Sequence, residues 1–126
     1  MKEKISELQT FGKVFKILYV EDNDDARTQT NNILSTFFKD ITLAVDGQDG
    51  LAKYLDCYKE NDSYFDLVIT DINMPNMDGI EMSKEIIKRN SLQSIIITTA
   101  HNEINFLTKA IEIGVSGFVT KPIINT

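Results

Sequence analysis

The sequence predicts an α/β domain in which helices cover both faces of a five-stranded parallel sheet, a doubly wound arrangement. Two observations predict this class. Five short apolar runs, rich in β-branched residues and without strict alternation, indicate strands that are buried on both faces. Segments with helical periodicity separate them, so strands and helices alternate along the chain. The five runs are residues 17–20, 41–45, 67–70, 95–98 and 118–120.

Four helices are expected between these strands. Asp24 or Asp25 is expected to cap the first, the second follows Asp46-Gly47, and the third follows Asp78-Gly79. A left-handed Gly114 is expected to end the fourth. The apolar residues expected to face inward are Ile33, Leu34, Phe37 and Phe38, then Leu51, Tyr54, Leu55 and Tyr58, then Ile80, Ile86 and Ile87, and finally Ile104, Leu107 and Ile111.

Composition narrows the class of protein further. A length of 126 residues without a Pro/Gly/Ser-rich linker fits a single globular domain. A net charge of −6 repels nucleic acid and anionic membranes, so neither is an expected partner. A single cysteine, Cys57, excludes an internal disulfide and is expected to be a small helix residue. No apolar run approaches the roughly 20 residues of a membrane span, and no hydrophobic signal core is visible, so we expect a cytoplasmic protein.

Polar residues follow four of the five predicted strands. Glu21 and Asp22 follow the first, Asp71 the third, Thr99 the fourth and Lys121 the fifth. The carboxyl ends of parallel strands meet at one edge of a doubly wound sheet, and ligands bind there. We therefore expect these five side chains to lie close together, although they are scattered along the chain.

These residue types suit phosphoryl transfer. Crowded carboxylates favour a hard divalent cation, Mg²⁺ or alternatively Mn²⁺. A carboxylate beside such a metal can attack phosphorus and form an acyl phosphate, while a lysine and a threonine hydroxyl stabilise the phosphoryl oxygens. Each residue alone also has an ordinary explanation, such as a helix N-terminus, a turn or a strand end. Their joint placement at four strand ends favours the site.

Four stretches resemble the receiver domains of bacterial two-component response regulators: residues 16–22, 67–79, 97–100 and 117–122. The resemblance covers about residues 16–124. It implies a flavodoxin-like fold with strand order 2-1-3-4-5. It also implies a phosphorylation-dependent switch that accepts a phosphoryl group from a histidine kinase or a phosphotransfer protein. Such a switch is not an enzyme in the usual sense, because it catalyses only its own phosphorylation and dephosphorylation.

The resemblance implies a role for each acidic residue. Asp71 is the expected phosphoacceptor. Asp22, Asp71 and the backbone carbonyl of Asn73 are expected to bind Mg²⁺ directly. Glu21 is expected to act on the metal through water, at a position where many family members have Asp.

The resemblance also implies a switch. Lys121 is expected to contact a phosphoryl oxygen, and its peptide bond to Pro122 is expected to be cis. Thr99 is expected to move toward the phosphoryl group, and the ring of Phe118 to turn inward behind it. The alternative for Phe118 is permanent packing in the core.

Two further positions are expected to tune the rate of dephosphorylation. Asn73 and His101 lie two residues after the acceptor and after the switch threonine, respectively. In similar proteins these places influence how fast water removes the phosphoryl group. The alternative for His101 is a solvated loop histidine.

Both ends of the chain depart from the family pattern. Only four residues follow Pro122, so the usual fifth helix is expected to be missing from a receiver domain at residues 15–126. We expect the chain to come from a longer protein with an output domain. Residues 1–14 form an extension in which Ile5, Leu8 and Phe11 recur at spacings of three. A helix there would cover the vacant site, within the chain or across a dimer, unless the segment is a linker.

Two other functions remain alternatives. A degenerate receiver would bind partners without being phosphorylated. A phosphatase of the haloacid dehalogenase type would use an Asp nucleophile with Mg²⁺, but it requires a second Asp as general acid. Asn73 occupies that place and cannot supply the proton.

Overall fold

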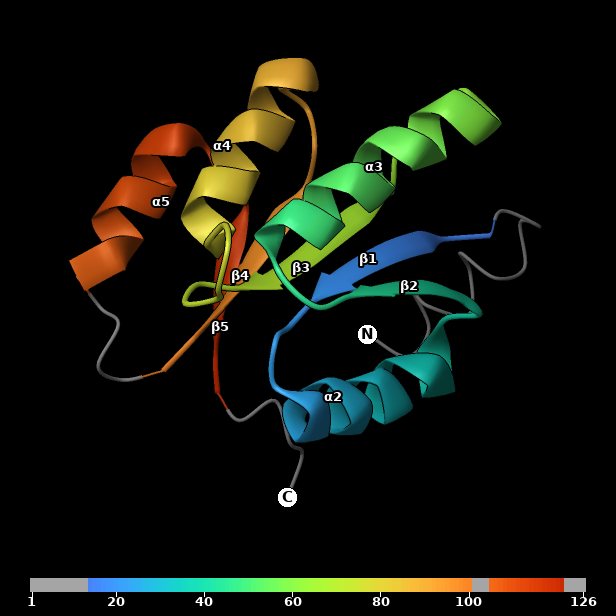
Figure 1. Cartoon of the computed structure of the whole chain (residues 1–126), viewed down its shortest axis with the longest axis horizontal. Coiled ribbons are helices and arrows are strands. Elements are labelled where there is room, and N and C mark those ends of the chain that lie inside the picture. Colours follow the sequence, from blue (N-terminus) through green and yellow to red (C-terminus); the bar gives the residue numbers. More distant parts are fainter. Residues whose placement is uncertain (1–13, 101–104, 122–126) are drawn as a thin grey trace.

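Strands and helices alternate along the whole of the described chain, which in this computed structural model comprises residues 14–100 and 105–121. The elements keep the labels of Figure 1, where they are coloured along the sequence. In chain order they are β1 (Lys16–Val20), α2 (Asp24–Phe37), β2 (Asp40–Ala44), α3 (Gly47–Asn61), β3 (Leu67–Asp71), α4 (Gly79–Arg89), β4 (Ile95–Thr99), α5 (Leu107–Ile113) and β5 (Gly117–Thr120).

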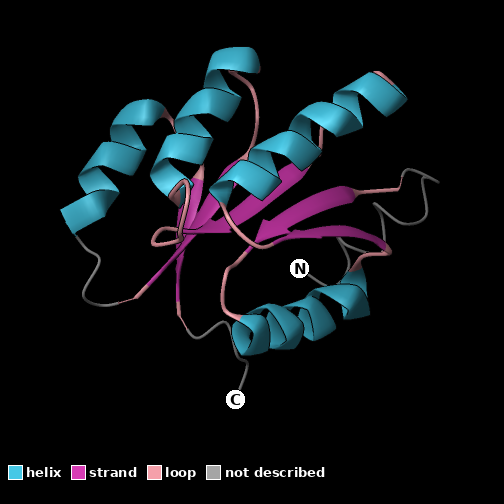
Figure 2. Cartoon of the chain, viewed as in Figure 1, coloured by secondary structure: helices cyan, strands magenta, loops and turns pink. Residues whose placement is uncertain are grey.

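The five strands form one parallel sheet in the order β2-β1-β3-β4-β5. Helices α3, α4 and α5 lie on one side of the sheet and α2 lies on the other (Figures 1 and 2). The predicted doubly wound fold and its strand order are therefore confirmed. The expectation that every strand is buried on both faces is wrong for β2 and β5, where most residues are half-buried or exposed. An edge strand has a neighbour on one side only, so less of it is covered.

Alternate residues of the central strands supply two apolar layers. Leu18 and Val20 of β1 point into the larger cluster, which also receives Ile86 of α4 and Ala110 of α5. Ile17 and Tyr19 of β1 and Ile69 of β3 form a smaller cluster with residues of α2 and β2. The central strands are thus fixed from both faces, and their carboxyl ends are rigid supports for side chains.

The helix ends test the capping predictions. The second and third helices begin after Asp46 and Asp78 as predicted, and these two residues cap α3 and α4, each accepting a backbone N–H of the first turn. Gly114 ends α5 in the left-handed region, with φ 98°. The prediction for α2 is wrong, because Asn23, and not Asp24 or Asp25, accepts the Ala26 N–H at 2.8 Å. Asn23 has the extended backbone that a cap requires, and the two aspartates already lie in the first turn.

The inward faces were predicted only in part. Tyr54 and Ile86 are fully buried, as expected, whereas Tyr58 is exposed and Ile111 has 62% of its surface exposed. The short helix α5 buries Ala110 instead. The four residues expected to face inward from the first helix are only half-buried, because among the described elements α2 is the one helix on its side of the sheet. Ile104 lies outside the described residues.

Three expectations at the chain ends stay predictions, because residues 1–13 and 122–126 lie outside the described part: the N-terminal helix, the missing final helix and the cis bond to Pro122. Val14, the first described residue, is exposed. None of the helices within residues 14–100 and 105–121 has the length and apolar character needed to cross a membrane.

The buried hydroxyl of Tyr54 is expected to make the free energy of unfolding fall as the pH rises into the alkaline range. It donates to Gln93 Oε1 at 2.6 Å and accepts from Asn90 Nδ2 at 3.3 Å. Burial raises the pKa of Tyr54 to about 12, so the folded protein keeps this proton at a pH where the unfolded chain, with a pKa of about 10, loses it. The stabilisation that comes from this difference in pKa is fully present below about pH 10. It is lost between about pH 10 and 12, where the free energy of unfolding falls by roughly 1.4 kcal/mol per pH unit.

We therefore expect the gap in unfolding free energy between the protein and Tyr54→Phe to narrow above about pH 10. Urea titrations from neutral pH upward would measure it. Tyr58→Phe, which removes the hydroxyl of an exposed tyrosine on the same helix, is the control. A constant gap for Tyr54→Phe would contradict the assignment.

Gly79 is a second position with a specific stability role. A Cβ there would lie 1.9 Å from the backbone oxygen of Asp71, because the first turn of α4 packs directly on the end of β3. We expect Gly79→Ala to lower the free energy of unfolding by about 2–4 kcal/mol, as the backbone must move to admit the methyl group. Gly117→Ala is the matched control, since a Cβ at Gly117 meets nothing within 4 Å. Equal urea midpoints for the two variants would refute the close packing.

Candidate functional site

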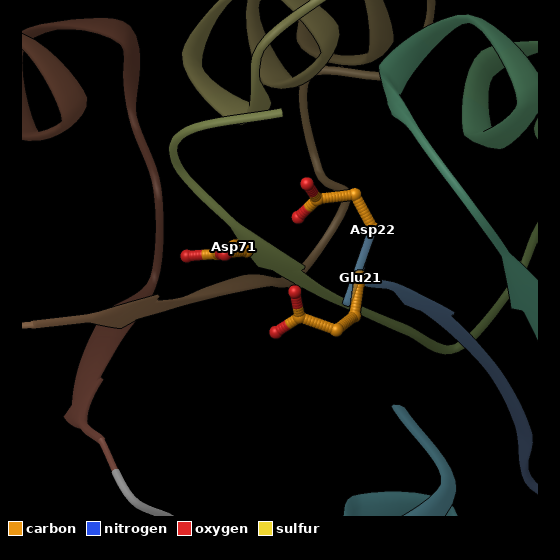
Figure 3. A group of neighbouring side chains, drawn as sticks. All are labelled: Glu21, Asp22 and Asp71. Carbon is orange, nitrogen blue, oxygen red and sulfur yellow. The ribbon is translucent and has the colours of Figure 1, made fainter. Parts of the chain in front are cut away.

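Three carboxylates meet where β1 and β3 end. Glu21 and Asp22 directly follow β1, and Asp71 is the last residue of β3. The two strands are neighbours, with Val20 beside Thr70, so the next residues of each are brought together. Carboxylate oxygens of Glu21, Asp22 and Asp71 lie within 4.8 Å of one another, and Figure 3 shows the three groups side by side. The clustering predicted from strand ends is confirmed for these three residues.

The three carboxylates differ in their exposure to water. Glu21 and Asp71 are buried, with 1% and 5% of their surface exposed, while Asp22 is exposed. Removing two carboxylates from water is costly unless a cation or hydrogen-bond donors compensate. The cluster is thus half inside the protein and open to solvent on the Asp22 side.

Lys121, which follows β5, supplies the positive charge. Its Nζ lies 2.8 Å from Asp71 Oδ2 and 3.1 Å from Glu21 Oε1. Its backbone N–H donates to the Thr99 carbonyl at 2.8 Å, which fixes the residue beside the end of β4. Burial by itself would lower the pKa of Lys121, but Asp71 and Glu21 outweigh it and raise the pKa. Lys121 is therefore held as an ammonium between two carboxylates.

Glu21 shows that one ammonium does not balance the cluster. Burial raises its pKa, and the charge of Asp71 adds to this, against the lowering effects of the Asn23 N–H and Lys121. The buried Oε1 of Glu21 has the Lys121 ammonium beside it at 3.1 Å, and that same ammonium is shared with Asp71. Among the described residues, Lys121 is the one ammonium that pairs with these three carboxylates, so this part of the site has an excess of negative charge.

These features fit a divalent cation. Mg²⁺ and Mn²⁺ prefer carboxylate oxygens, and the cluster offers three such groups, two of them buried. Within residues 14–100 and 105–121, this is the one group of three or more His, Cys, Asp or Glu side chains that is close enough to hold a metal. Asn73, the fourth expected ligand, lies two residues beyond Asp71 on an exposed loop, and its part in metal binding stays a prediction.

Each oxygen of the Asp71 carboxylate has a bonding partner that fixes its orientation. Oδ1 accepts the N–H of Ile72 at 2.8 Å, and Oδ2 pairs with Lys121. Its backbone oxygen accepts the Thr70 hydroxyl at 2.9 Å. A carboxylate held in this way has few conformations to lose before a reaction, which favours it as a nucleophile.

The two proposed switch residues lie on the neighbouring strands β4 and β5. Thr99 is buried at the end of β4, and its hydroxyl donates to the Ala100 carbonyl at 3.1 Å. Phe118 on β5 has 37% of its surface exposed, so it is not packed in the core in this structure. The coupled movement of the two residues stays a prediction. His101 lies outside the described residues.

Sequence reasoning missed one residue that supports the acidic pair. The Arg27 guanidinium on α2 donates from Nη1 to the Glu21 backbone carbonyl at 2.8 Å and forms an ion pair with Asp24. Its largely buried side chain thus ties the start of α2 to the residue that follows β1. The spacing from Asp24 to Arg27 indicates a helical ion pair, but no pattern in the sequence indicates the contact with Glu21.

The sequence of this chain is similar to those of known proteins. Residues 17–126 match the family model described as the response regulator receiver domain. The chain is 31% identical over 113 residues to the chemotaxis protein CheY of Treponema pallidum, covering 89% of this chain and 76% of that protein. It is also 31% identical over 114 residues to the sensor protein EvgS of Escherichia coli, covering 90% of this chain but only 9% of EvgS.

A solved structure agrees in fold. A chain in the crystal structure of the CheX–CheY–BeF₃–Mg²⁺ complex from Borrelia burgdorferi superposes with a TM-score of 0.76. It is 29% identical to this chain, and the match covers 87% of this chain and 80% of that one.

Proposed function

Because this chain belongs to the receiver domain family of two-component response regulators, we propose that it is a phosphorylation-dependent switch that accepts a phosphoryl group on Asp71. The observation that carries the proposal is the position of the Asp71 carboxylate. It is buried, oriented by the Ile72 N–H, and held between the Lys121 ammonium and the acidic pair.

The proposed reaction is a simple displacement. A carboxylate oxygen of Asp71 attacks the phosphorus of a phosphohistidine or a small acyl phosphate. The new oxygen–phosphorus bond forms as the bond to the donor breaks, and the imidazole or carboxylate leaves with the electron pair. The product is an acyl phosphate on Asp71. Lys121, already 2.8 Å from the attacking group, stabilises negative charge on the phosphoryl oxygens.

The metal belongs to the same proposal. Glu21, Asp22 and Asp71 would hold Mg²⁺ or Mn²⁺, together with the backbone carbonyl of Asn73. When bound, the ion neutralises charge on the phosphoryl oxygens. The excess negative charge of the three carboxylates supports this role. The CheY complex from Borrelia burgdorferi, which is similar in fold, includes Mg²⁺.

The switch would follow from phosphorylation. We propose that the Thr99 hydroxyl exchanges the Ala100 carbonyl, its present acceptor, for a phosphoryl oxygen. The exposed ring of Phe118 on the neighbouring strand would then turn inward. Water would later remove the phosphoryl group at a rate tuned by Asn73 and His101. Two observations support this proposal. The Thr99 hydroxyl donates to the carbonyl of the adjacent Ala100, and Phe118 has 37% of its surface exposed.

The partners are proposed from the same family membership. The donor would be a histidine kinase or a phosphotransfer protein, and an output domain in a longer protein would read the switch. The chain matches both the small CheY of Treponema pallidum and a small part of the much longer EvgS, so such domains occur in proteins of both kinds. The net charge of −6 makes direct contact with nucleic acid or an anionic membrane unfavourable.

Incubation with acetyl phosphate tests the proposal. Intact-mass measurement should show one phosphoryl adduct that forms with Mg²⁺ and not with an excess of EDTA. Absence of an adduct in a folded chain that binds Mg²⁺ would instead favour the degenerate receiver, which acts without phosphorylation. Circular dichroism on the same samples separates that outcome from unfolding.

A further inference from the structure

The loop that follows Asp71 is closed at its base and tightly turned at its tip. At the base, the Gly79 N–H donates to the Ile72 carbonyl at 2.8 Å. At the tip, the Met77 N–H donates to the Pro75 carbonyl at 2.7 Å across Asn76, whose φ is 69°. This is a γ-turn with a positive φ at its centre, a form that is rare in proteins because it is strained. A non-glycine residue keeps such a conformation only where its surroundings hold it.

The surroundings of this tip are the N-terminus of α3. The Asn76 side-chain amide donates to Asp46 Oδ2 at 2.8 Å, and the Gly47 N–H donates to the Met77 carbonyl at 3.0 Å. The approach is so close that a Cβ on Gly47 would lie 2.2 Å from the Met77 oxygen. Two hydrogen bonds therefore tie the loop to a helix 30 residues away in the sequence.

Asp46 is suited to this second contact. Its Oδ1 accepts the Asp49 N–H at 2.7 Å as the cap of α3, which leaves Oδ2 for Asn76. The Asp49 N–H and the Asn76 amide lower the pKa of Asp46, so the group accepts as a carboxylate. Hydrogen bonds to a charged acceptor are stronger than those between neutral groups. One side chain thus joins the start of α3 to the loop after the acceptor strand.

We propose that Asn76 and Asp46 are positioning residues for the metal site: their hydrogen bond fixes the loop that carries Asn73 beside the carboxylates and so sets the affinity for Mg²⁺. Asn73 lies three residues before Asn76, between the closed base and the anchored tip. A loop fixed at both places has little freedom to move the Asn73 carbonyl. The inference rests on the proposed function, because it assumes that the acidic cluster binds Mg²⁺ together with that carbonyl.

An exchange of donor and acceptor tests the hydrogen bond itself. Asp46→Asn retains a residue that caps helices well, but it replaces one of the two accepting oxygens with an amide donor. The double variant Asp46→Asn/Asn76→Asp restores a donor and an acceptor in reversed positions, and Asp tolerates a positive φ as Asn does. Asp78→Asn is the control, since it makes the same change at the cap of α4.

The measured quantity is the dissociation constant for Mg²⁺, determined by titration calorimetry on the unphosphorylated protein. We expect Asp46→Asn to raise it about tenfold, as loss of outer contacts to a metal site commonly does. The double variant should return most of the affinity, and Asp78→Asn should match the unmodified protein. The Mg²⁺ concentration at half-maximal phosphorylation should change in parallel.

Two results would overturn the inference while leaving the proposed function intact. In one, the unmodified protein binds Mg²⁺ and is phosphorylated, and Asp46→Asn binds the metal equally well while unfolding at a lower temperature in EDTA; the contact would then serve stability alone. In the other, the double variant stays as weak as Asp46→Asn. If the unmodified protein neither binds Mg²⁺ nor takes up a phosphoryl group, the proposed function fails and this inference fails with it.

Discussion

Asp71→Asn should reduce the uptake of a phosphoryl group from acetyl phosphate to the level of a sample without donor. The neutral amide cannot attack phosphorus to form an acyl phosphate. The site should otherwise be preserved, because the side-chain oxygen can still accept the Ile72 N–H that Asp71 Oδ1 accepts at 2.8 Å. Lys121 would keep Glu21 as its ion-pair partner. The loss would therefore report on chemistry and not on folding.

Intact mass spectrometry with and without Mg²⁺ measures this effect. Asp56→Asn provides the matched control, since it makes the same change on an exposed residue of α3 and should leave the adduct intact. Thermal unfolding of each variant would establish that both are folded. A persistent Mg²⁺-dependent adduct on Asp71→Asn would mean that another residue is the acceptor, and peptide mapping would identify it.

Asp22→Asn should weaken the binding of Mg²⁺ by at least about tenfold and slow phosphorylation at limiting Mg²⁺ to the same extent. Asp22 is the exposed member of the acidic cluster, so under the proposal it would offer a metal-binding oxygen without a role in the core. Replacing its carboxylate removes one of three like charges that lie within 4.8 Å. The metal-free variant should therefore be at least as stable as the unmodified protein, because repulsion within the cluster is relieved.

Titration calorimetry with Mg²⁺ and urea unfolding in EDTA would separate these two effects. Asp25→Asn, an exposed position in the first turn of α2, removes the same charge close by and should bind Mg²⁺ normally. An unchanged affinity in Asp22→Asn would exclude Asp22 from the metal site. A large loss of stability without metal would show instead that its carboxylate supports the fold.

Much of the architecture follows from the sequence because the bonds involved are local. Asp46 and Asp78 cap helices by accepting N–H groups three residues away, and Gly114 ends α5 through its own backbone conformation. The apolar runs predicted five parallel strands. Because carboxyl ends of parallel strands meet at one edge, strand order and strand ends together predicted that Glu21, Asp22 and Asp71 would cluster.

The tertiary structure alone decided which side chains pair and which are exposed. The proximity of Lys121 to the carboxylates was predicted from strand ends, but its pairing with both Asp71 and Glu21 depends on how the folded sheet spaces those ends. The bond from Asn76 to Asp46 joins segments 30 residues apart. Ile111 has an apolar side chain at helical spacing, yet it is exposed because α5 packs through Ala110. Periodicity and capping patterns report bonds within a few residues, whereas burial and ion pairing depend on neighbours that only the folded chain brings together.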